Sequence, residues 1–175
     1  MMETLETSIG AVLFTDLVGF TEFNDVAGDQ AAVAALDAQL DLTRGTLEAH
    51  PEARVVKELG DGLMIWLGDA RPALGVASAL LASFERARDT GTFPLPVRMG
   101  IHHGEVVRRG DDLVGQTVNI AARVADLAGP GELLATEAIT DCSSPTPAGI
   151  ELLPVGPASV KGVSDPIWLH LVTPL

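Results

Sequence analysis

The sequence is poor in cysteine and in basic residues, and it has no apolar run long enough to cross a bilayer. Its single cysteine, Cys142, excludes an intrachain disulfide and a multi-cysteine zinc site. The chain has 11 Lys and Arg residues and 24 Asp and Glu residues, and no segment contains a cluster of basic residues. This balance argues against nucleic acid and anionic lipid as partners. The longest strongly apolar stretch covers only residues 73–84, and the first residues, METLET, are acidic rather than signal-like. We therefore expect a cytoplasmic location without membrane insertion.

What is present is the composition of a globular protein. Hydrophobic residues make up 47% of the 175 positions and charged residues 20%. A chain of this length buries roughly 70% of its unfolded surface, which is enough for one core, so we expect a single domain over residues 1–175. With a net charge of −13, such a domain can bind a polyphosphate only with the help of divalent cations and a few well-placed basic residues.

Two strand patterns each lead to an aspartate. Residues 9–16, IGAVLFTD, form a continuous apolar run that predicts a central strand ending on Asp16. The runs ARVVKEL and GLMIWL flank Gly60-Asp61-Gly62, where two glycines favour a tight hairpin with Asp61 at the turn. Apolar and polar residues alternate from Val97, and ELLAT reads as another short strand. The tail holds three more β-like runs, IELLPVG, ASVKGV and PIWLHLV.

Three longer segments have helical periodicity. Between Asp29 and His50 the spacings of three and four predict an amphipathic helix whose inner face holds Val33, Leu36, Leu40, Thr43 and Leu47. A second helix can begin after Asp69 as its cap, and its buried face holds Leu74, Ala77, Leu81 and Phe84. A third runs from about Thr117 to Ala128. This order predicts an α+β fold with a ferredoxin-like βαββαβ core, extra C-terminal strands, and a mostly antiparallel sheet flanked by helices.

Asp16 and Asp61 lie at the ends of neighbouring predicted strands. Two such carboxylates can share a pair of divalent ions about 3.5–4 Å apart, an arrangement that stabilises the attacking and leaving oxygens in phosphoryl transfer. Just beyond Asp16, a turn at Gly19 can point backbone N–H groups at phosphate oxygens, and the residues concerned are Val18, Gly19, Phe20 and Thr21. Each aspartate can equally be an ordinary turn or cap residue, an alternative that either motif alone leaves open.

Two further pairs of polar residues are candidates for a site. Asn119 and Arg123 are four positions apart and share one face of the third predicted helix. An amide and a guanidinium there can hold a ribose and a phosphate, although the pair taken alone fits a solvated polar face better. His102 and His103 look like a metal pair, but neighbours on a strand point to opposite faces, so we expect packing or solvent exposure for them.

The motifs taken together resemble those of the class III nucleotide cyclases. FTDLVGFT is similar to the first metal motif of that family, VKELGDG to its second, and DLVGQTVNIAAR to the stretch that carries base-selecting and transition-state residues. MGIHHGEV and VKGVSDPIWLHLV are also similar to family strands. The resemblance extends from Ile9 to Val172, so we place the core of the domain at about residues 9–172. Val114 stands before Gly115 where many relatives carry tryptophan, and we expect this change to affect local packing only.

The resemblance implies a role for each residue that matches a family motif. Asp16 and Asp61 would bind two Mg²⁺ or Mn²⁺ ions, with the backbone carbonyl of Leu17 in the metal shell. The remaining roles are base selection by Lys57 and Asp112, ribose orientation by Asn119, stabilisation of the pentavalent phosphorus by Arg123, and triphosphate contacts by Arg98 and Lys161. Similar cyclases are head-to-tail homodimers whose sites take the metal aspartates from one chain and the base, ribose and transition-state residues from the other.

Hydrogen bonding distinguishes the two purines. Adenine offers an acceptor at N1 and a donor amine at N6, whereas guanine offers an O6 acceptor beside an N1–H donor. Lys57 only donates and ionised Asp112 only accepts, so the pair fits adenine. We therefore expect an adenylate cyclase that converts ATP to 3′,5′-cyclic AMP and pyrophosphate by in-line attack of the ribose 3′-hydroxyl.

Three alternatives remain at this point. They are a guanylate cyclase, a catalytically silent cyclase-like module that serves regulatory dimerisation, and another nucleotidyl transferase such as a polymerase or a diguanylate cyclase. Asp16, Asp61, Asn119 and Arg123 are all present, which speaks against a silent module. The sequence has neither a GGDEF-like motif nor a basic groove for a template, which speaks against the other transferases.

Overall fold

The computed structural model describes residues 5–175, and within this range the strands form one sheet of eight. The order is β2–β3–β1–β4–β6–β8–β7, and the short β5 pairs with β4. β4 and β6 are parallel, whereas the other neighbouring pairs are antiparallel. The strands are β1 (Glu6–Leu17), β2 (Ala53–Leu59), β3 (Gly62–Leu67), β4 (Val97–Arg109), β5 (Asp112–Val114), β6 (Leu133–Thr136), β7 (Ile150–Ala158) and β8 (Ile167–Pro174).

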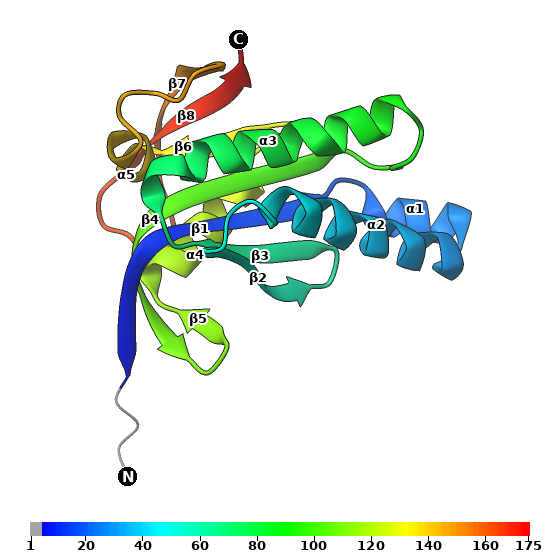
Figure 1. Cartoon of the computed structure of the whole chain (residues 1–175), viewed down its shortest axis with the longest axis horizontal. Coiled ribbons are helices and arrows are strands. Elements are labelled where there is room, and N and C mark those ends of the chain that lie inside the picture. Colours follow the sequence, from blue (N-terminus) through cyan, green and yellow to red (C-terminus); the bar gives the residue numbers. More distant parts are fainter. Residues whose placement is uncertain (1–4) are drawn as a thin grey trace.

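Helices cover both faces of this sheet (Figure 1). α2 and α3 pack on one face, with α1 beside α2, and α4 packs on the opposite face. Among the helices that the structure describes, none is both long enough and apolar enough to cross a membrane. The helices are α1 (Phe20–Ala27), α2 (Asp29–Leu47), α3 (Ala70–Asp89), α4 (Gln116–Leu127) and α5 (Glu137–Cys142).

The first half of the chain has the ferredoxin-like arrangement. In chain order the elements are β1, α1 with α2, β2, β3, α3 and β4, and in space the strands follow the order β2–β3–β1–β4. β6, β8 and β7 then extend the sheet beyond β4. The predicted fold class is therefore confirmed: an α+β fold, a ferredoxin-like core, extra C-terminal strands and a mostly antiparallel sheet flanked by helices.

The central strand β1 is buried on both sides, which explains its continuous apolar run. Leu13 and Leu17 face the core beneath α2 and α3. Val12 faces the smaller core that includes Met64 of β3 and Ala121 of α4. Because successive strand residues point to opposite faces, both faces of β1 need apolar residues.

Several local predictions differ from the structure. α2 ends at Leu47 rather than at residue 50, and Val33 is 55% exposed instead of buried. The inner face of α2 carries Gln39 because its amide forms hydrogen bonds beneath the helix. α1 and α5 were not predicted as helices. ASVKGV is not a separate strand, since β7 already ends at Ala158 and a loop leads from there to β8.

α4 lies unusually close to β4, and two strand glycines permit this approach. A Cβ atom added at Gly100 would lie 2.1 Å from the backbone nitrogen of Ala125. A Cβ atom added at Gly104 would lie 2.5 Å from the hydroxyl of Thr117. The two glycines of the MGIHHGE segment therefore set the distance between α4 and the sheet. This distance also sets the position of Asn119 and Arg123, which lie on α4.

Candidate active site

Asp16 and Asp61 lie next to each other at one end of the sheet. Asp16 is the residue before the last one of β1 and pairs with Gly62 at the start of β3, so the β2–β3 turn brings Asp61 to the same place. The Leu17 N–H donates to the Asp61 carbonyl at 3.3 Å. Burial raises the pKa of the Asp61 carboxyl above its ordinary value, and the neighbouring Asp16 carboxylate raises this pKa further. The two acids therefore form a close pair of like charges.

This pair has the chemistry of a divalent cation site. Two carboxylates held together resist ionisation unless a positive charge neutralises them. Within residues 5–175 no third His, Cys, Asp or Glu joins them to make a larger cluster. The protein would then contribute only oxygen ligands, the two carboxylates and the Leu17 carbonyl, and oxygen ligands suit Mg²⁺ and Mn²⁺. The residues present fit the ions that the family motifs imply.

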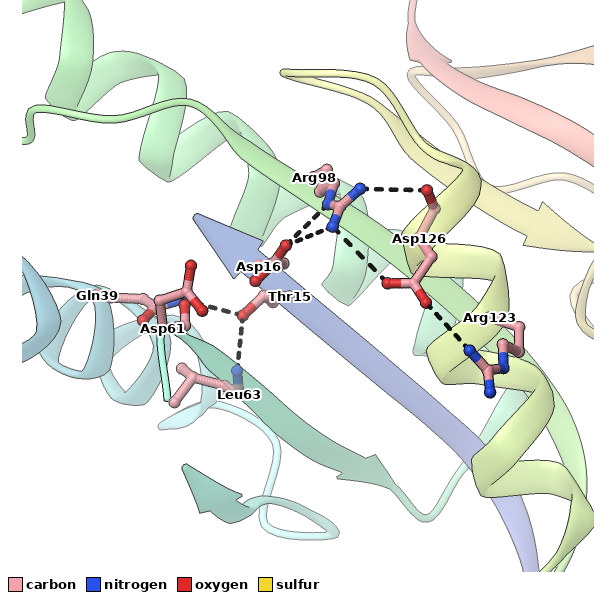
Figure 2. A network of polar contacts seen from close by, with 8 residues as sticks. All are labelled: Thr15, Asp16, Gln39, Asp61, Leu63, Arg98, Arg123 and Asp126. Atoms are coloured by element: carbon pink, nitrogen blue, oxygen red, sulfur yellow. Dashed lines mark hydrogen bonds and ion pairs between the residues drawn. The ribbon is translucent and has the colours of Figure 1, made fainter. Parts of the chain in front are cut away.

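Gln39 supports the two strands that carry the aspartates, and the sequence analysis missed it. Its side-chain amide donates to the Thr15 hydroxyl at 3.2 Å and to the Asp61 carbonyl at 3.3 Å (Figure 2). The Thr15 hydroxyl also accepts from the Leu63 N–H at 3.3 Å. The available signal was a glutamine on the inner face of an amphipathic helix, because a buried amide needs hydrogen-bond partners.

Arg98 on β4 contacts Asp16 directly. Its Nε and Nη2 atoms lie 2.8 and 2.7 Å from the same oxygen of the Asp16 carboxylate. Its Nη1 atom also donates to the Asp126 carbonyl at 3.1 Å. Figure 2 shows Arg98 between the end of β1 and the end of α4. A guanidinium in this place can supply positive charge to a bound triphosphate beside the two acids.

The turn after β1 partly matches the predicted phosphate-binding turn. Gly19 has φ 78°, a left-handed conformation that glycine adopts without strain, and it precedes α1. The Phe20 and Thr21 N–H groups belong to the first turn of α1, where backbone donors can meet an anion. Val18 is different, because its N–H already donates to the Pro96 carbonyl at 2.8 Å. The prediction that the Val18 N–H points at phosphate is therefore wrong.

Lys57 and Asp112 form a pair at another place on the sheet. The Lys57 ammonium lies 2.8 Å from an Asp112 carboxylate oxygen. This hydrogen bond lowers the pKa of Asp112, whose side chain is 39% exposed. Lys57 is on β2 beside a bulge, and Asp112 begins β5. The structure thus joins a donor and an acceptor that stand 55 positions apart in the sequence.

A pocket on the α4 side gathers three more of the predicted residues. Asn119 and Arg123 line it together with Lys161, and its volume is about 390 Å³. The loop carrying Lys161 is held to α4 by a hydrogen bond of 3.4 Å from the Gln116 amide to the Gly162 carbonyl. An amide, a guanidinium and an ammonium therefore converge on one cavity, which suits a ribose and phosphates.

The two adjacent histidines have different side-chain partners. His102 Nδ1 lies 2.8 Å from the Thr136 hydroxyl, and His103 Nδ1 lies 3.3 Å from the thiol of Cys142. Burial lowers the pKa of His102 to about 4 and also lowers that of His103. At neutral pH the His102 imidazole is therefore uncharged.

Comparison with known proteins gives the family. Residues 4–173 match the family model of the adenylate and guanylate cyclase catalytic domain. A pH-sensitive adenylate cyclase of Mycobacterium tuberculosis is 29% identical over 92% of this chain and 40% of its own length. An adenylate cyclase of Streptomyces coelicolor is 34% identical over 75% of this chain and 33% of its own length. The chain thus spans less than half the length of these two curated relatives.

Solved structures agree in fold. The adenylyl cyclase CyaB from P. aeruginosa superposes with a TM-score of 0.84 at 24% identity, over 99% of this chain and 97% of that one. The guanylate cyclase domain of RhGC from Catenaria anguillulae superposes with a TM-score of 0.82 at 18% identity, over 97% and 98%. At these identities the likeness concerns the fold alone. Because the family model covers nearly the whole sequence, the chain belongs to the adenylate and guanylate cyclase catalytic domain family.

Proposed function

We propose that this chain is an adenylate cyclase that converts ATP to 3′,5′-cyclic AMP and pyrophosphate. The observation that carries the proposal is the presence in one chain of both halves of such a site. The close acid pair of Asp16 and Asp61 forms one half, and the pocket of Asn119, Arg123 and Lys161 forms the other. A silent module of this family would be expected to lack one of these halves.

The chain's own residues bind and orient the nucleotide. Arg98, Lys161 and the N–H groups of Gly19, Phe20 and Thr21 would hold the triphosphate. Asn119 would orient the ribose so that its 3′-oxygen faces the α-phosphorus. The new 3′-oxygen–phosphorus bond forms as the bond to the β-phosphate oxygen breaks, and pyrophosphate leaves.

Positive charge stabilises the phosphorus during this exchange. Arg123 would neutralise the charge that develops on the α-phosphoryl oxygens. Two Mg²⁺ or Mn²⁺ ions on Asp16, Asp61 and the Leu17 carbonyl would stabilise the attacking and leaving oxygens. The proton of the 3′-hydroxyl can leave to solvent or to a substrate phosphate, so the proposal needs no protein base.

ATP is the proposed substrate because of the base-selecting pair. The ammonium of Lys57 can donate to adenine N1, and the carboxylate of Asp112 can accept from the N6 amine. The low pKa of Asp112 keeps it an acceptor at neutral pH. The Mycobacterium and Streptomyces relatives are both named adenylate cyclases, which also supports ATP.

The proposed active form is a head-to-tail homodimer. Lys57 and Asp61 belong to one hairpin, but Lys57 pairs with Asp112 while Asp61 lies beside Asp16. The β2–β3 hairpin therefore contributes residues to two separate locations, Lys57 to the proposed base-binding pair and Asp61 to the acid pair. In the head-to-tail arrangement, Asp16 and Asp61 of one protomer would face the base, ribose and transition-state residues of its partner, which gives two sites per dimer.

The decisive experiment is an assay of the purified chain with ATP or GTP and with Mg²⁺ or Mn²⁺, the products being separated by chromatography. We expect cyclic AMP, with a kcat/KM for ATP at least about tenfold above that for GTP. The Asp61→Asn variant should lose turnover while its circular dichroism spectrum stays unchanged. Preferential formation of cyclic GMP would support a guanylate cyclase, and absence of any cyclic nucleotide would support a silent dimerisation module.

A further inference from the structure

Asp126, in the last turn of α4, lies between two arginines of the proposed site. One of its carboxylate oxygens is 3.7 Å from Nη2 of Arg98, and the other is 3.8 Å from Nη1 of Arg123. Its backbone carbonyl also accepts the hydrogen bond from Nη1 of Arg98 at 3.1 Å. Figure 2 shows this carboxylate facing both guanidinium groups. Neither the family motifs nor the proposed reaction gives Asp126 a role.

The position of Asp126 is poor for helix stability. The C-terminal end of a helix carries partial negative charge, so a carboxylate in the last turn is unfavourable there. Asp126 comes one residue before the end of α4. Its cationic neighbours in the structure are the two arginines, which are the favourable partners for a carboxylate at this helix end.

The contacts form an unbroken chain of alternating charges from β1 to α4. Asp16 binds Arg98, Arg98 binds Asp126, and Asp126 binds Arg123. The first link is short and half-buried, whereas the side chains of Arg123 and Asp126 are 55% and 58% exposed. The ion pair between Asp126 and Arg123 is therefore the weak and adjustable member of this series of contacts.

In the proposed head-to-tail dimer, this chain of charges connects two different sites. Arg98 acts beside the metal aspartates of its own protomer, whereas Arg123 reaches the site built on the aspartates of the partner. We propose that Asp126 is a positioning residue that couples the two active sites through these arginines. This inference rests on the proposed function and on the proposed dimer.

The direction of the coupling follows from electrostatics. A triphosphate bound at the first site draws the charge of Arg98 toward its own oxygens. The Asp126 carboxylate then has Arg123 as its main cationic partner and holds it more tightly. The nucleotide at the second site must compete with Asp126 for Arg123, so it binds more weakly than the first. Exposed ion pairs are weak, which sets the expected ratio of the two dissociation constants at about two- to fivefold.

The test measures nucleotide binding instead of turnover. Isothermal titration calorimetry of the dimer with 3′-deoxy-ATP, which lacks the attacking hydroxyl, and Mg²⁺ gives both dissociation constants. The constants compared are intrinsic ones, from which the statistical factor for two identical sites has been removed, so two independent sites give equal values. Asp126→Asn removes the charge of the side chain but keeps its shape and its backbone carbonyl, so Arg98 retains that hydrogen bond. Asp37→Asn is the matched control, because Asp37 is an exposed aspartate on α2 without an ion pair among the described residues.

We expect unequal constants in the wild type and in Asp37→Asn, and nearly equal constants in Asp126→Asn. Asp126→Glu, which keeps the charge, should keep the inequality, and it provides the comparison if Asp126→Asn fails to fold. Equal constants in the wild type, or an inequality that survives in Asp126→Asn, would overturn the coupling while leaving the proposed function intact. Absence of any nucleotide binding by the wild type would overturn the proposed function and the coupling with it.

Discussion

In the proposed reaction, Lys57 and Asp112 would select the base by the polarity of their hydrogen bonds. The pair holds itself together at 2.8 Å, so its two members are already placed side by side before a base arrives. A purine must then offer an acceptor to one and a donor to the other. Adenine does so, whereas guanine would leave the donor and the acceptor of this half-buried pair without matching partners, which would disfavour GTP.

Changing the polarity of this pair should change the substrate. In Lys57→Glu with Asp112→Ala, the new carboxylate can accept from guanine N1–H and N2–H₂, and the adenine acceptor loses its donor. We expect the ATP to GTP ratio of kcat/KM to fall by at least about tenfold, without complete conversion, because Ala122 and other parts of the pocket stay unchanged. Asp111→Ala, at the neighbouring exposed position, should keep the ratio. A double variant with the parent ratio would contradict the base-selecting role.

Individual site residues were predictable from the sequence to the extent that a local motif contains them. Asp16 and Asp61 each end an apolar run, and the structure does bring them together. Gln39 was missed although its place on the inner face of a helix was a signal, and neither its partner Thr15 nor the partner of Asp126, Arg98, could be named, because they lie 24 and 28 positions away in the sequence. The Val18 prediction failed because the sequence does not show that Pro96 supplies an acceptor for its N–H.

At the scale of elements, the contact of α4 with β4 sets the position of Asn119 and Arg123. The backbone of α4 reaches the strand at Gly100, where a side chain has no room. The neighbour there is backbone, which cannot rotate away as a flexible side chain can. Any side chain at this position must therefore lift the helix or distort the strand.

Gly100→Ala should consequently affect both stability and turnover. The added methyl would overpack the interface, and we expect a loss of about 1–3 kcal/mol in the free energy of unfolding. A displacement of α4 by about 1 Å can cost a factor of about 100 in rate, so kcat should fall at least tenfold. Urea unfolding at fixed protein concentration and the cyclase assay measure the two effects.

Gly75→Ala is the matched control for this prediction. Gly75 lies in α3 and has no atom within 4 Å of an added Cβ, so alanine should leave stability unchanged or raise it by about 0.5–1 kcal/mol. If Gly100→Ala unfolded at the same urea concentration as Gly75→Ala, the close contact would not govern the position of α4.

Periodicity predicted the long elements well and the short ones poorly. α2 and α3 repeat apolar residues over several turns and were predicted from that repeat, whereas α4 was predicted from the Gly-Pro-Gly sequence that ends it. α1 has only eight residues and none is fully buried, so its apolar pattern, Phe20 and Phe23 against the main core, is too short to predict a helix. In ASVKGV, apolar residues alternate as in a strand, but this segment starts at the end of β7 and turns toward α4, where Val160 is buried. Tertiary contact decided its structure, not local preference.

At the scale of the whole molecule, the acidic charge is opposed at a few defined places. The net charge of −13 disfavours a triphosphate, whereas Arg98, Arg123 and Lys161 lie where the proposed phosphates would bind. The ferredoxin-like topology was predictable from the order of elements. The parallel pairing of β6 with β4 was not, because no turn connects these strands and only their packing in space brings them together.

The proposed dimer makes a quantitative prediction for mixed subunits. Asp61→Ala removes the metal half of a site, and Arg123→Ala removes the transition-state half, so each variant alone should be nearly inactive. After subunit exchange at equal amounts, about half of the dimers are hybrids, and each hybrid has one complete site of two. Activity should therefore recover to about a quarter of the wild-type value per dimer.

The matched control mixes two variants that damage the same half. A hybrid of Asp16→Ala and Asp61→Ala has a broken metal half at both sites, so this mixture should stay inactive although its subunits exchange equally well. Differently tagged chains that co-purify after mixing would demonstrate the exchange in both experiments. If the Asp61→Ala and Arg123→Ala mixture then showed no recovery, Asp61 and Arg123 would have to act in the same protomer's site. Because Asp126 lies between Arg98 and Arg123 of one chain, such a result would also make it a residue within one site and not a link between two.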